Sequence, residues 1–537
     1  MRLRPYLGVL VLLAFAAPLT FAFCSHAVIA SLGDDSVSYL VLGRFLSPFA
    51  SDPLTAPWAG HYSHFPPLFP LLLALTGCAY DFFVAHMVVA ACALIALAMV
   101  CAYGTLRFSD ARGGLILAVV FLLLPSAWIS ITGILSEPFY LAFSLAAVVF
   151  HERRMAKESM SSSVIVGLLL AAACLTRVAG IALLAAYVVR VAMAAISRRS
   201  RPSFRECLPV LIVLALQGLW IAVRPPLEGN GYQADLGSML GHWIDEPLHV
   251  AAISWSSVSG GWISSFASDS GAPFAMHIAF AIVAILALAA AVRGAMRNRL
   301  DAWYLLASAA MLFIWVYRED NQRRLLYPLL PLMLAHAAEA FGALVDRLGA
   351  NQHRLKLIAV ATGIIAALAA PPTLLILEKA FDREPLIAGF DYSASSMTEY
   401  YTTVNVENAR AAAWQHAAVL AGLQSLERVT PPDAKVMWMR PEYVALLGRR
   451  EAVPWYFSWD RATLAREIRR TGTRYVVVTR IFKSDLAGQG GDEYAAFAID
   501  TPAYLHASSV IANTRSGAQE FVLLEVDAEL LEREAIK

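Results

Sequence analysis

The sequence predicts a polytopic α-helical membrane protein of about eleven spans with a soluble α/β domain at its C-terminal end. Of its 537 residues, 58% are hydrophobic and only 15% are charged, whereas about a quarter of an ordinary soluble domain is charged. Apolar stretches of the length needed to cross about 30 Å of hydrocarbon recur as far as residue 379. From residue 380 the composition is that of a soluble protein. The sequence therefore predicts two parts, 1–379 and 380–537.

Eleven apolar stretches are expected to span the membrane. They are residues 7–30, 82–106, 113–131, 135–150, 164–175, 178–196, 208–223, 273–292, 302–316, 325–344 and 357–377. The apolar run from 164 to 196 is too long for one crossing and holds Arg177 near its middle, so we expect two short helices that turn at Thr176 and Arg177. The first stretch is longer than a usual signal-peptide core and many spans follow it, which favours an uncleaved span.

The distribution of basic residues predicts the orientation of these spans. If the N-terminus is cytoplasmic, the cytoplasmic connections hold most of the arginine and lysine residues of the membrane part, at 2, 4, 107, 112, 153, 154, 157, 198, 199, 201, 205, 293, 297, 299, 347, 354 and 356. An odd number of spans then places residues 380–537 outside the cytoplasm. The two long connections, 31–80 and 224–272, lie on that same outer face.

The C-terminal part has the pattern of a small α/β domain. Residues 435–439 and 475–479 are short apolar runs typical of buried strands, and 521–526 is expected to form a late strand. Residues 461–470 have the pattern of a helix between the first two strands.

Two adjacent acids, Asp34 and Asp35, directly follow the first span. Neighbouring side chains point in different directions, so one acid can take a proton while the other orients a partner. A carboxylate beside the bilayer is costly to desolvate, which raises its pKa and suits it to general-base catalysis. The alternative is a helix N-cap and a solvated acid before an interfacial helix over 37–45.

Further polar residues fall on the outer face. His61 and His64 are three positions apart and permit a divalent metal ion, although no third ligand adjoins them; satisfied or solvated histidines are the alternative. Glu137 follows Ser136 at the outer end of a span. An ionisable group at membrane depth is a functional candidate, and the alternative is a helix cap.

The arginines that break the orientation rule lie on the outer face, at 44, 177, 224, 318, 323 and 324. Arg177 lies between two short spans, where a cation needs an anionic partner such as a lipid phosphate or an internal acid. Arg323 and Arg324 belong to the polar cluster 317–324, and the planar guanidinium suits bidentate phosphate binding. A solvated loop with internal ion pairs is the alternative for that cluster. The second long connection offers His242, Asp245, Glu246 and His249, whose spacing permits a metal or an acid/base role without specifying either. The six cysteines are scattered, with no disulfide or metal-binding spacing.

Taken together, these stretches resemble the GT-C superfamily of membrane glycosyltransferases, in the branch of the protein O-mannosyltransferases and the lipid A aminoarabinose transferase. The resemblance rests on the order and the shared outer placement of several segments. They are Asp34-Asp35, Phe65-Pro66-Pro67-Leu68-Phe69-Pro70, Leu135-Ser136-Glu137-Pro138, Leu175-Thr176-Arg177 with Gly180, and Arg324-Leu325-Leu326-Tyr327-Pro328.

The resemblance implies an inverting sugar transfer from a polyprenyl-phosphate donor to an extracytoplasmic glycolipid, glycan or protein, in the inner membrane of a bacterium. It implies that Asp34 or Asp35 is the catalytic base and that Arg177, Arg324 and Arg323 bind the donor phosphate. Tyr39, Glu137, His61 and His64 are expected to support the site. Membrane lipids are expected partners and nucleic acid is not. No cofactor is required, and a divalent metal ion stays open.

Two other functions also fit the sequence. A transporter or lipid flippase would have many spans and an intramembrane arginine, but the chain shows no clear repeat and no polar residues gathered near the midplane. A ligase that uses a polyprenyl-diphosphate glycan would need the same kind of groove and would differ mainly in the size of its donor.

Overall fold

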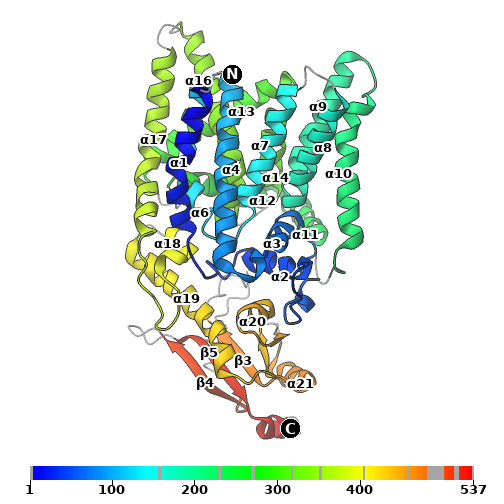
Figure 1. Cartoon of the computed structure of the whole chain (residues 1–537), viewed down its shortest axis with the longest axis vertical. Helices are drawn as coiled ribbons and strands as arrows, with labels where there is room; N and C mark the ends of the chain where they lie inside the picture. Colours follow the sequence, from blue (N-terminus) through cyan, green and yellow to red (C-terminus); the bar gives the residue numbers. More distant parts are fainter. Residues whose placement is uncertain are drawn as a thin grey trace.

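The computed structural model is a bundle of long helices with a small sheet beyond one end of it (Figure 1). It describes residues 4–154, 159–227, 232–267, 272–315, 319–349, 354–402, 405–455, 459–479, 501–512 and 519–534. The N-terminus lies at the end of the bundle far from the sheet, and the last helix, α23 (Ala528–Glu534), lies beside the sheet.

Each of the eleven expected spans overlaps a helix of the bundle. These helices are α1 (Arg4–Cys24), α4 (Phe82–Phe108), α5 (Ala111–Leu122), α7 (Glu137–Arg154), α8 (Met160–Thr176), α9 (Gly180–Arg198), α10 (Phe204–Val223), α13 (Phe274–Met296), α14 (Leu300–Ile314), α16 (Leu330–Arg347) and α17 (Arg354–Lys379). By length and composition, seven helices among the described residues can cross a membrane, and four further apolar helices are shorter. The predicted polytopic helical fold is confirmed.

The two short helices predicted around Arg177 are confirmed, because α8 ends at Thr176 and α9 begins at Gly180. Gly180 permits this tight turn: a Cβ atom there would lie 2.6 Å from backbone atoms of Cys174. The expected span 113–131 is wrong as a single helix. It breaks at Pro125, which begins the short helix α6 (Pro125–Ile129), since proline cannot donate the hydrogen bond that a continuous helix needs.

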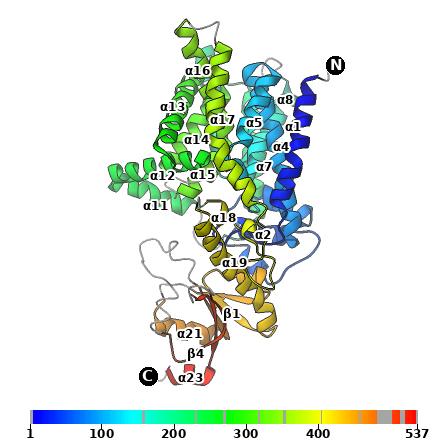
Figure 2. The same ribbon diagram turned by 90° about the vertical axis from the view of Figure 1, so that its left-hand side faces the viewer.

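The two long connections are largely helical. The first holds α2 (Ser36–Leu46), η1 (Ala56–Trp58), α3 (Leu68–Leu75) and η2 (Cys78–Tyr80), which lie across the end of the bundle nearest the sheet. The second was expected as a loop, but it holds α11 (Tyr232–Asp245) and α12 (Pro247–Ala267), which reach sideways from the bundle in Figure 2. After α14, the short helices α15 (Glu319–Leu326) and η3 (Tyr327–Leu329) lead into α16; α15 packs beside α12 and η3 beside α7.

The C-terminal part contains a five-stranded sheet in the order β2-β1-β3-β5-β4. The strands are β1 (Lys435–Trp438), β2 (Glu451–Pro454), β3 (Tyr475–Thr479), β4 (Leu505–Ala512) and β5 (Gln519–Val526). β1 pairs in parallel with β2 and β3, whereas β5 pairs antiparallel with β3 and β4. The predicted strands 435–439, 475–479 and 521–526 are confirmed, as is the helix over 461–470, α21 (Arg461–Thr471).

Alternate strand residues face two different cores, as the two-residue period of a strand requires. Val477 and Phe521 point to the face covered by α19 (Val406–Val429), where a Cβ atom on Gly422 would lie 2.3 Å from the Phe521 ring. That core continues into the helix bundle. Val476 and Val478 point to the face that packs on α21. The boundary placed at residue 380 stays a prediction.

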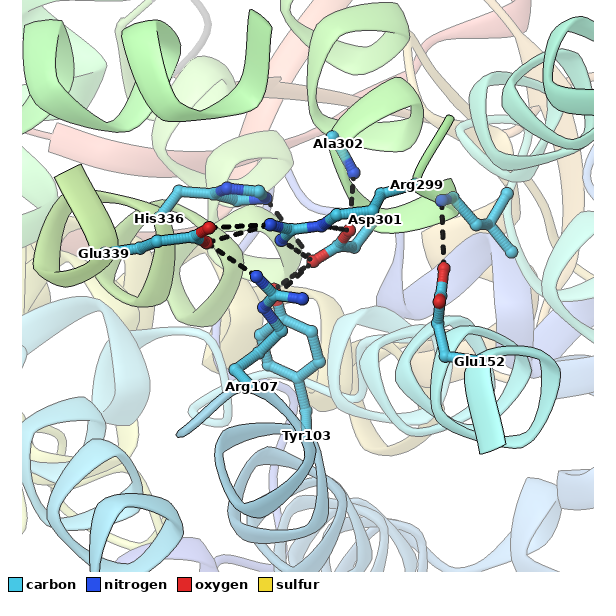
Figure 3. Close-up of polar contacts among 9 residues, drawn as sticks. Tyr103, Arg107, Glu152, Arg299, Asp301, Ala302, His336 and Glu339 are labelled. Carbon is cyan, nitrogen blue, oxygen red and sulfur yellow. Dashed lines mark hydrogen bonds and ion pairs between the residues drawn. The ribbon is translucent and has the colours of Figure 1, made fainter. Parts of the chain in front are cut away.

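A buried cluster of ion pairs joins three bundle helices at the end far from the sheet (Figure 3). The Arg299 guanidinium lies 2.8 Å from Asp301 Oδ2 and 2.9 Å from Glu339 Oε1. Arg107, in the last turn of α4, lies 2.6 Å from Glu339 Oε2, and the Tyr103 hydroxyl donates to Asp301 at 2.9 Å. These pairs hold α4, α14 and α16 together.

Candidate active site

Five charged side chains from distant parts of the sequence meet at the end of the bundle nearest the sheet. Asp34 and Asp35 come from the connection that follows α1, Glu137 begins α7, Arg177 lies between α8 and α9, and Arg324 comes from α15. The predicted grouping of the acid pair with Glu137, Arg177 and Arg324 agrees with this geometry. The catalytic and phosphate-binding roles remain predictions.

Glu137 is the centre of the cluster. Its side chain is 0% exposed, and its Oε1 atom lies 3.0 Å from Arg177 Nη1 and 2.8 Å from Arg324 Nε. One buried carboxylate oxygen therefore holds both guanidinium groups. Burying a charge is costly unless it is paired, so these contacts fix the two arginines in place before any ligand arrives. The carboxylate has this role in addition to beginning a helix.

The two acids of the pair have different surroundings. Asp35 Oδ2 accepts a hydrogen bond from Arg324 Nη2 at 2.7 Å, and its side chain is 30% exposed. Burial alone would raise the pKa of Asp35, but the nearby Arg324 and Arg177 guanidinium groups outweigh it and lower that pKa. Asp35 is therefore a carboxylate that orients Arg324. It occupies the N-cap position of α2 without making a side-chain capping bond.

Asp34 makes no ion pair among the described residues. Its Oδ1 atom accepts a hydrogen bond from the Ser36 backbone N–H at 2.9 Å, whereas its buried Oδ2 atom has no partner in the described part of the chain. Burial raises the pKa of Asp34 to about 7, against the opposing effect of Arg324. A carboxyl that titrates near neutral pH is suited to accept a proton.

Gly133 makes room for Asp34. A Cβ atom at residue 133 would lie 2.6 Å from Asp34 Oδ2 and 3.2 Å from Ser36 Oγ. The next residue, Ile134, donates its backbone N–H to Ser36 Oγ at 3.0 Å. The segment before α7 therefore packs directly on the acid pair. Gly133 was not predicted from the sequence to be a site residue, although its position four residues before Glu137 could have indicated that it lies near the site.

Tyr39 and Ser136 connect the acid pair to the arginines. The Tyr39 hydroxyl lies 2.8 Å from Ser136 Oγ, which also accepts a hydrogen bond from Arg177 Nη1 at 3.1 Å. The Tyr39 ring packs edge-on against Phe65 and Phe69 of the proline-rich segment. The supporting role of Tyr39 stays a prediction.

The two histidines lie at different places on the first connection. His64 packs on Phe65 and contributes to the electrostatic environment that lowers the pKa of Asp35. His61 packs on Trp58 and acts electrostatically on Glu442 of the C-terminal part. Within the described ranges, no group of three His, Cys, Asp or Glu residues has the geometry of a metal site.

Arg323 does not share the position of its neighbour. It is buried on α15, and its backbone N lies 3.0 Å from where a Cβ atom of Gly261 on α12 would be. The ion pairs with Asp35 and Glu137 belong to Arg324. The phosphate-binding role of Arg323 stays a prediction.

No protein-family model and no curated protein sequence matches the chain. Nineteen chains of solved structures match its fold. One is ArnT from Cupriavidus metallidurans in the apo state, with 12% sequence identity, a TM-score of 0.56, and coverage of 98% of this chain and 99% of ArnT. Another is ArnT from the same organism bound to undecaprenyl phosphate, with 13% identity, a TM-score of 0.52, and coverage of 96% and 98%.

These matches extend over nearly the whole length of both chains, including the sheet. At such low identity they establish the fold and not the chemistry. The chain therefore has the fold of ArnT, which agrees with the predicted multi-span helical part followed by a small α/β part.

Proposed function

We propose that this protein is a membrane glycosyltransferase that moves a sugar from a polyprenyl-phosphate donor to an extracytoplasmic glycolipid, glycan or protein, with inversion at the anomeric carbon. The observation that carries the proposal is that Asp34, whose pKa burial raises to about 7, lies near Arg324, which shares the buried Glu137 carboxylate with Arg177. The shared fold with an ArnT that binds undecaprenyl phosphate supports the choice of donor.

Arg177 and Arg324 each have N–H groups that can bind a phosphate. A guanidinium has five N–H groups. The contacts of Arg324 with Glu137 and Asp35 use Nε and Nη2, and those of Arg177 with Glu137 and Ser136 use Nη1. Among the described residues, Nη1 of Arg324 and Nη2 of Arg177 take part in none of these contacts, and we propose that they bind phosphate oxygens. Negative charge grows on the phosphate as the sugar leaves, and fixed cations stabilise that charge in the transition state.

Asp34 is the proposed base. It takes the proton of the acceptor hydroxyl while the acceptor oxygen forms a bond to the anomeric carbon. The bond between that carbon and the phosphate oxygen breaks, and the polyprenyl phosphate leaves with the electron pair. Asp35 holds Arg324 in position, and Glu137, Tyr39 and His64 maintain the surrounding geometry and charge.

The proposed orientation follows the basic residues of the membrane part. The N-terminus is cytoplasmic, and the acid pair and residues 380–537 face outward, in the inner membrane of a bacterium. A lipid-linked sugar then supplies the energy of transfer from its own phosphate bond. No step of the proposed reaction uses a metal ion, so any bound divalent ion would have a separate role.

The test uses purified protein in vesicles with a polyprenyl-phosphate sugar labelled in the sugar. We expect Asp34→Asn to abolish transfer while binding of polyprenyl phosphate persists, and Arg324→Ala to weaken that binding. Asp460→Asn is the control, because Asp460 is an exposed cap of α21 in the C-terminal part. Full transfer by Asp34→Asn would refute the base assignment.

The same vesicles separate this proposal from the alternatives. Movement of the lipid or another substrate across the bilayer without covalent change would identify a transporter or flippase. Transfer only from a polyprenyl-diphosphate glycan would identify a ligase.

A further inference from the structure

The short helix α20 (Pro441–Leu447) brings the C-terminal part against the acid pair. It follows β1 and contacts α2, the helix that begins directly after Asp35. All seven of its residues are buried. A surface helix of a separate soluble domain would keep one polar face in water, so the burial of α20 indicates a docked element.

A buried acid fixes the end of α20 nearest β2. Asp52 Oδ2 lies 2.7 Å from Arg449 Nη1, just beyond α20, and 2.7 Å from Arg44 Nη1 of α2. The Asp52 side chain is 3% exposed. One carboxylate of the first outer connection therefore binds both the membrane part and the C-terminal part.

A second contact fixes the beginning of α20. The Glu442 side chain, which is buried, lies near the Tyr62 hydroxyl of the first outer connection and interacts with it. Tyr62 lies between His61 and His64, the histidines that the sequence singled out. α20 is thus held at both ends on the connection that carries Asp34 and Asp35.

Tyr443 lies between these two contacts and is 2% exposed. Its ring packs edge-on against Trp438 with the ring centroids 6.1 Å apart. Burial and the nearby Asp34 carboxylate raise the pKa of Tyr443 well above its usual value, and Asp35 and Glu442 add to the effect while Arg440 opposes it. The phenol is therefore neutral, and it belongs to a buried helix that contacts α2, the helix directly after the acid pair.

We propose that α20 closes the candidate active site and that Tyr443 is a positioning residue that shields the Asp34 carboxyl from water. The inference rests on the proposed role of Asp34 as base. It assigns to the C-terminal part a function within the site: the acid pair is complete only when α20 is docked on the first outer connection.

The other groups around Asp34 do not supply this shielding. Arg324 of α15 favours the ionised form of Asp34, as do the hydrogen bonds from Ser36, whereas Asp35 disfavours it. His64 and Arg177 act on Asp35. Loss of the Tyr443 ring would admit water beside Asp34 and leave Arg324 in place, so the ionised form of Asp34 would become more favourable.

The experiment measures protonation without relying on catalysis. A hydrophobic carbodiimide reacts with protonated carboxyl groups, and mass spectrometry of the peptide that holds Asp34 gives the extent of labelling at each pH. We expect labelling of the full-length wild-type protein to fall with a midpoint near pH 7. Tyr443→Ala should lower that midpoint by at least about one pH unit, whereas Tyr443→Phe, which keeps the ring, should restore most of it.

Arg449→Ala covers the case in which Tyr443→Ala does not fold. This substitution removes the ion pair with Asp52 just beyond the end of α20, at a side chain that is 37% exposed. It should also lower the midpoint of labelling. Arg474→Ala is the matched control, since Arg474 makes an exposed ion pair with Glu525 in the sheet, 3.2 Å long. It should leave the midpoint unchanged.

The outcomes separate this inference from the proposed function. An unchanged midpoint in folded Tyr443→Ala and Arg449→Ala, or a wild-type midpoint near pH 4, would overturn the inference even if sugar transfer is observed. The expected shifts in a protein that transfers no sugar would leave the shielding supported and refute the proposed function.

Discussion

Replacement of Glu137 by glutamine should destabilise the protein strongly. The substitution keeps the shape of the side chain and removes a fully buried negative charge, which pairs with Arg177 at 3.0 Å and Arg324 at 2.8 Å. Removal of one partner from a buried ion pair typically costs about 3–5 kcal/mol, because the remaining charge is left uncompensated. Because Asp35 still pairs with Arg324, we expect the substitution to lower the free energy of unfolding by about 3 kcal/mol, the lower end of that range.

The measurement is equilibrium unfolding in mixed micelles, with Glu451→Gln as the control. Glu451 pairs with Lys435 at 2.8 Å on the surface of the sheet, and an exposed pair contributes at most about 1 kcal/mol. Polyprenyl phosphate should stabilise Glu137→Gln more than it stabilises the wild type, since the phosphate replaces the missing anion. A free energy of unfolding for Glu137→Gln equal to that of Glu451→Gln would refute the central role of the buried carboxylate.

Three further predictions follow from the same contacts. Sugar transfer should rise as the pH rises through about 7, because Asp34, whose pKa is about 7, accepts a proton only when ionised; a pH profile that is flat from 5 to 8 would contradict this. Gly133→Ala should place a Cβ atom 2.6 Å from Asp34 Oδ2, cost about 1–3 kcal/mol of stability and lower transfer, whereas Gly363→Ala, which meets nothing within 4 Å, should do neither. Asp301→Asn should cost about 3 kcal/mol, because Arg107 and Arg299 lose one anion but still pair with Glu339; binding of polyprenyl phosphate, measured with folded protein, should stay unchanged.

The spans and strands could be predicted because each depends on local pattern. Apolar runs of membrane-crossing length predicted the helices of the bundle, and the short apolar runs at 475–479 and 521–526 predicted β3 and β5. The break at Pro125 and the two helices of the second long connection were missed. They depend on packing against neighbouring helices as well as on residue pattern.

The residue types of the site could also be recognised, but not the pairing between them. Asp34, Asp35, Glu137, Arg177 and Arg324 stood out because charge beside a membrane is costly and therefore rare. Adjacent acids are equivalent in a sequence, and only the structure separated them: Asp35 contacts Arg324, while Asp34 packs against Gly133.

The sequence alone determined that this is a many-span membrane protein with charged residues gathered on one face and a soluble part after them. Those properties follow from the cost of moving polar groups into hydrocarbon, which acts on each segment separately. The tertiary structure decided which arginines Glu137 holds, which acid remains unpaired, and that α20 docks on the first outer connection. These depend on contacts between residues up to about four hundred positions apart, such as Asp52 and Arg449, which no local pattern encodes.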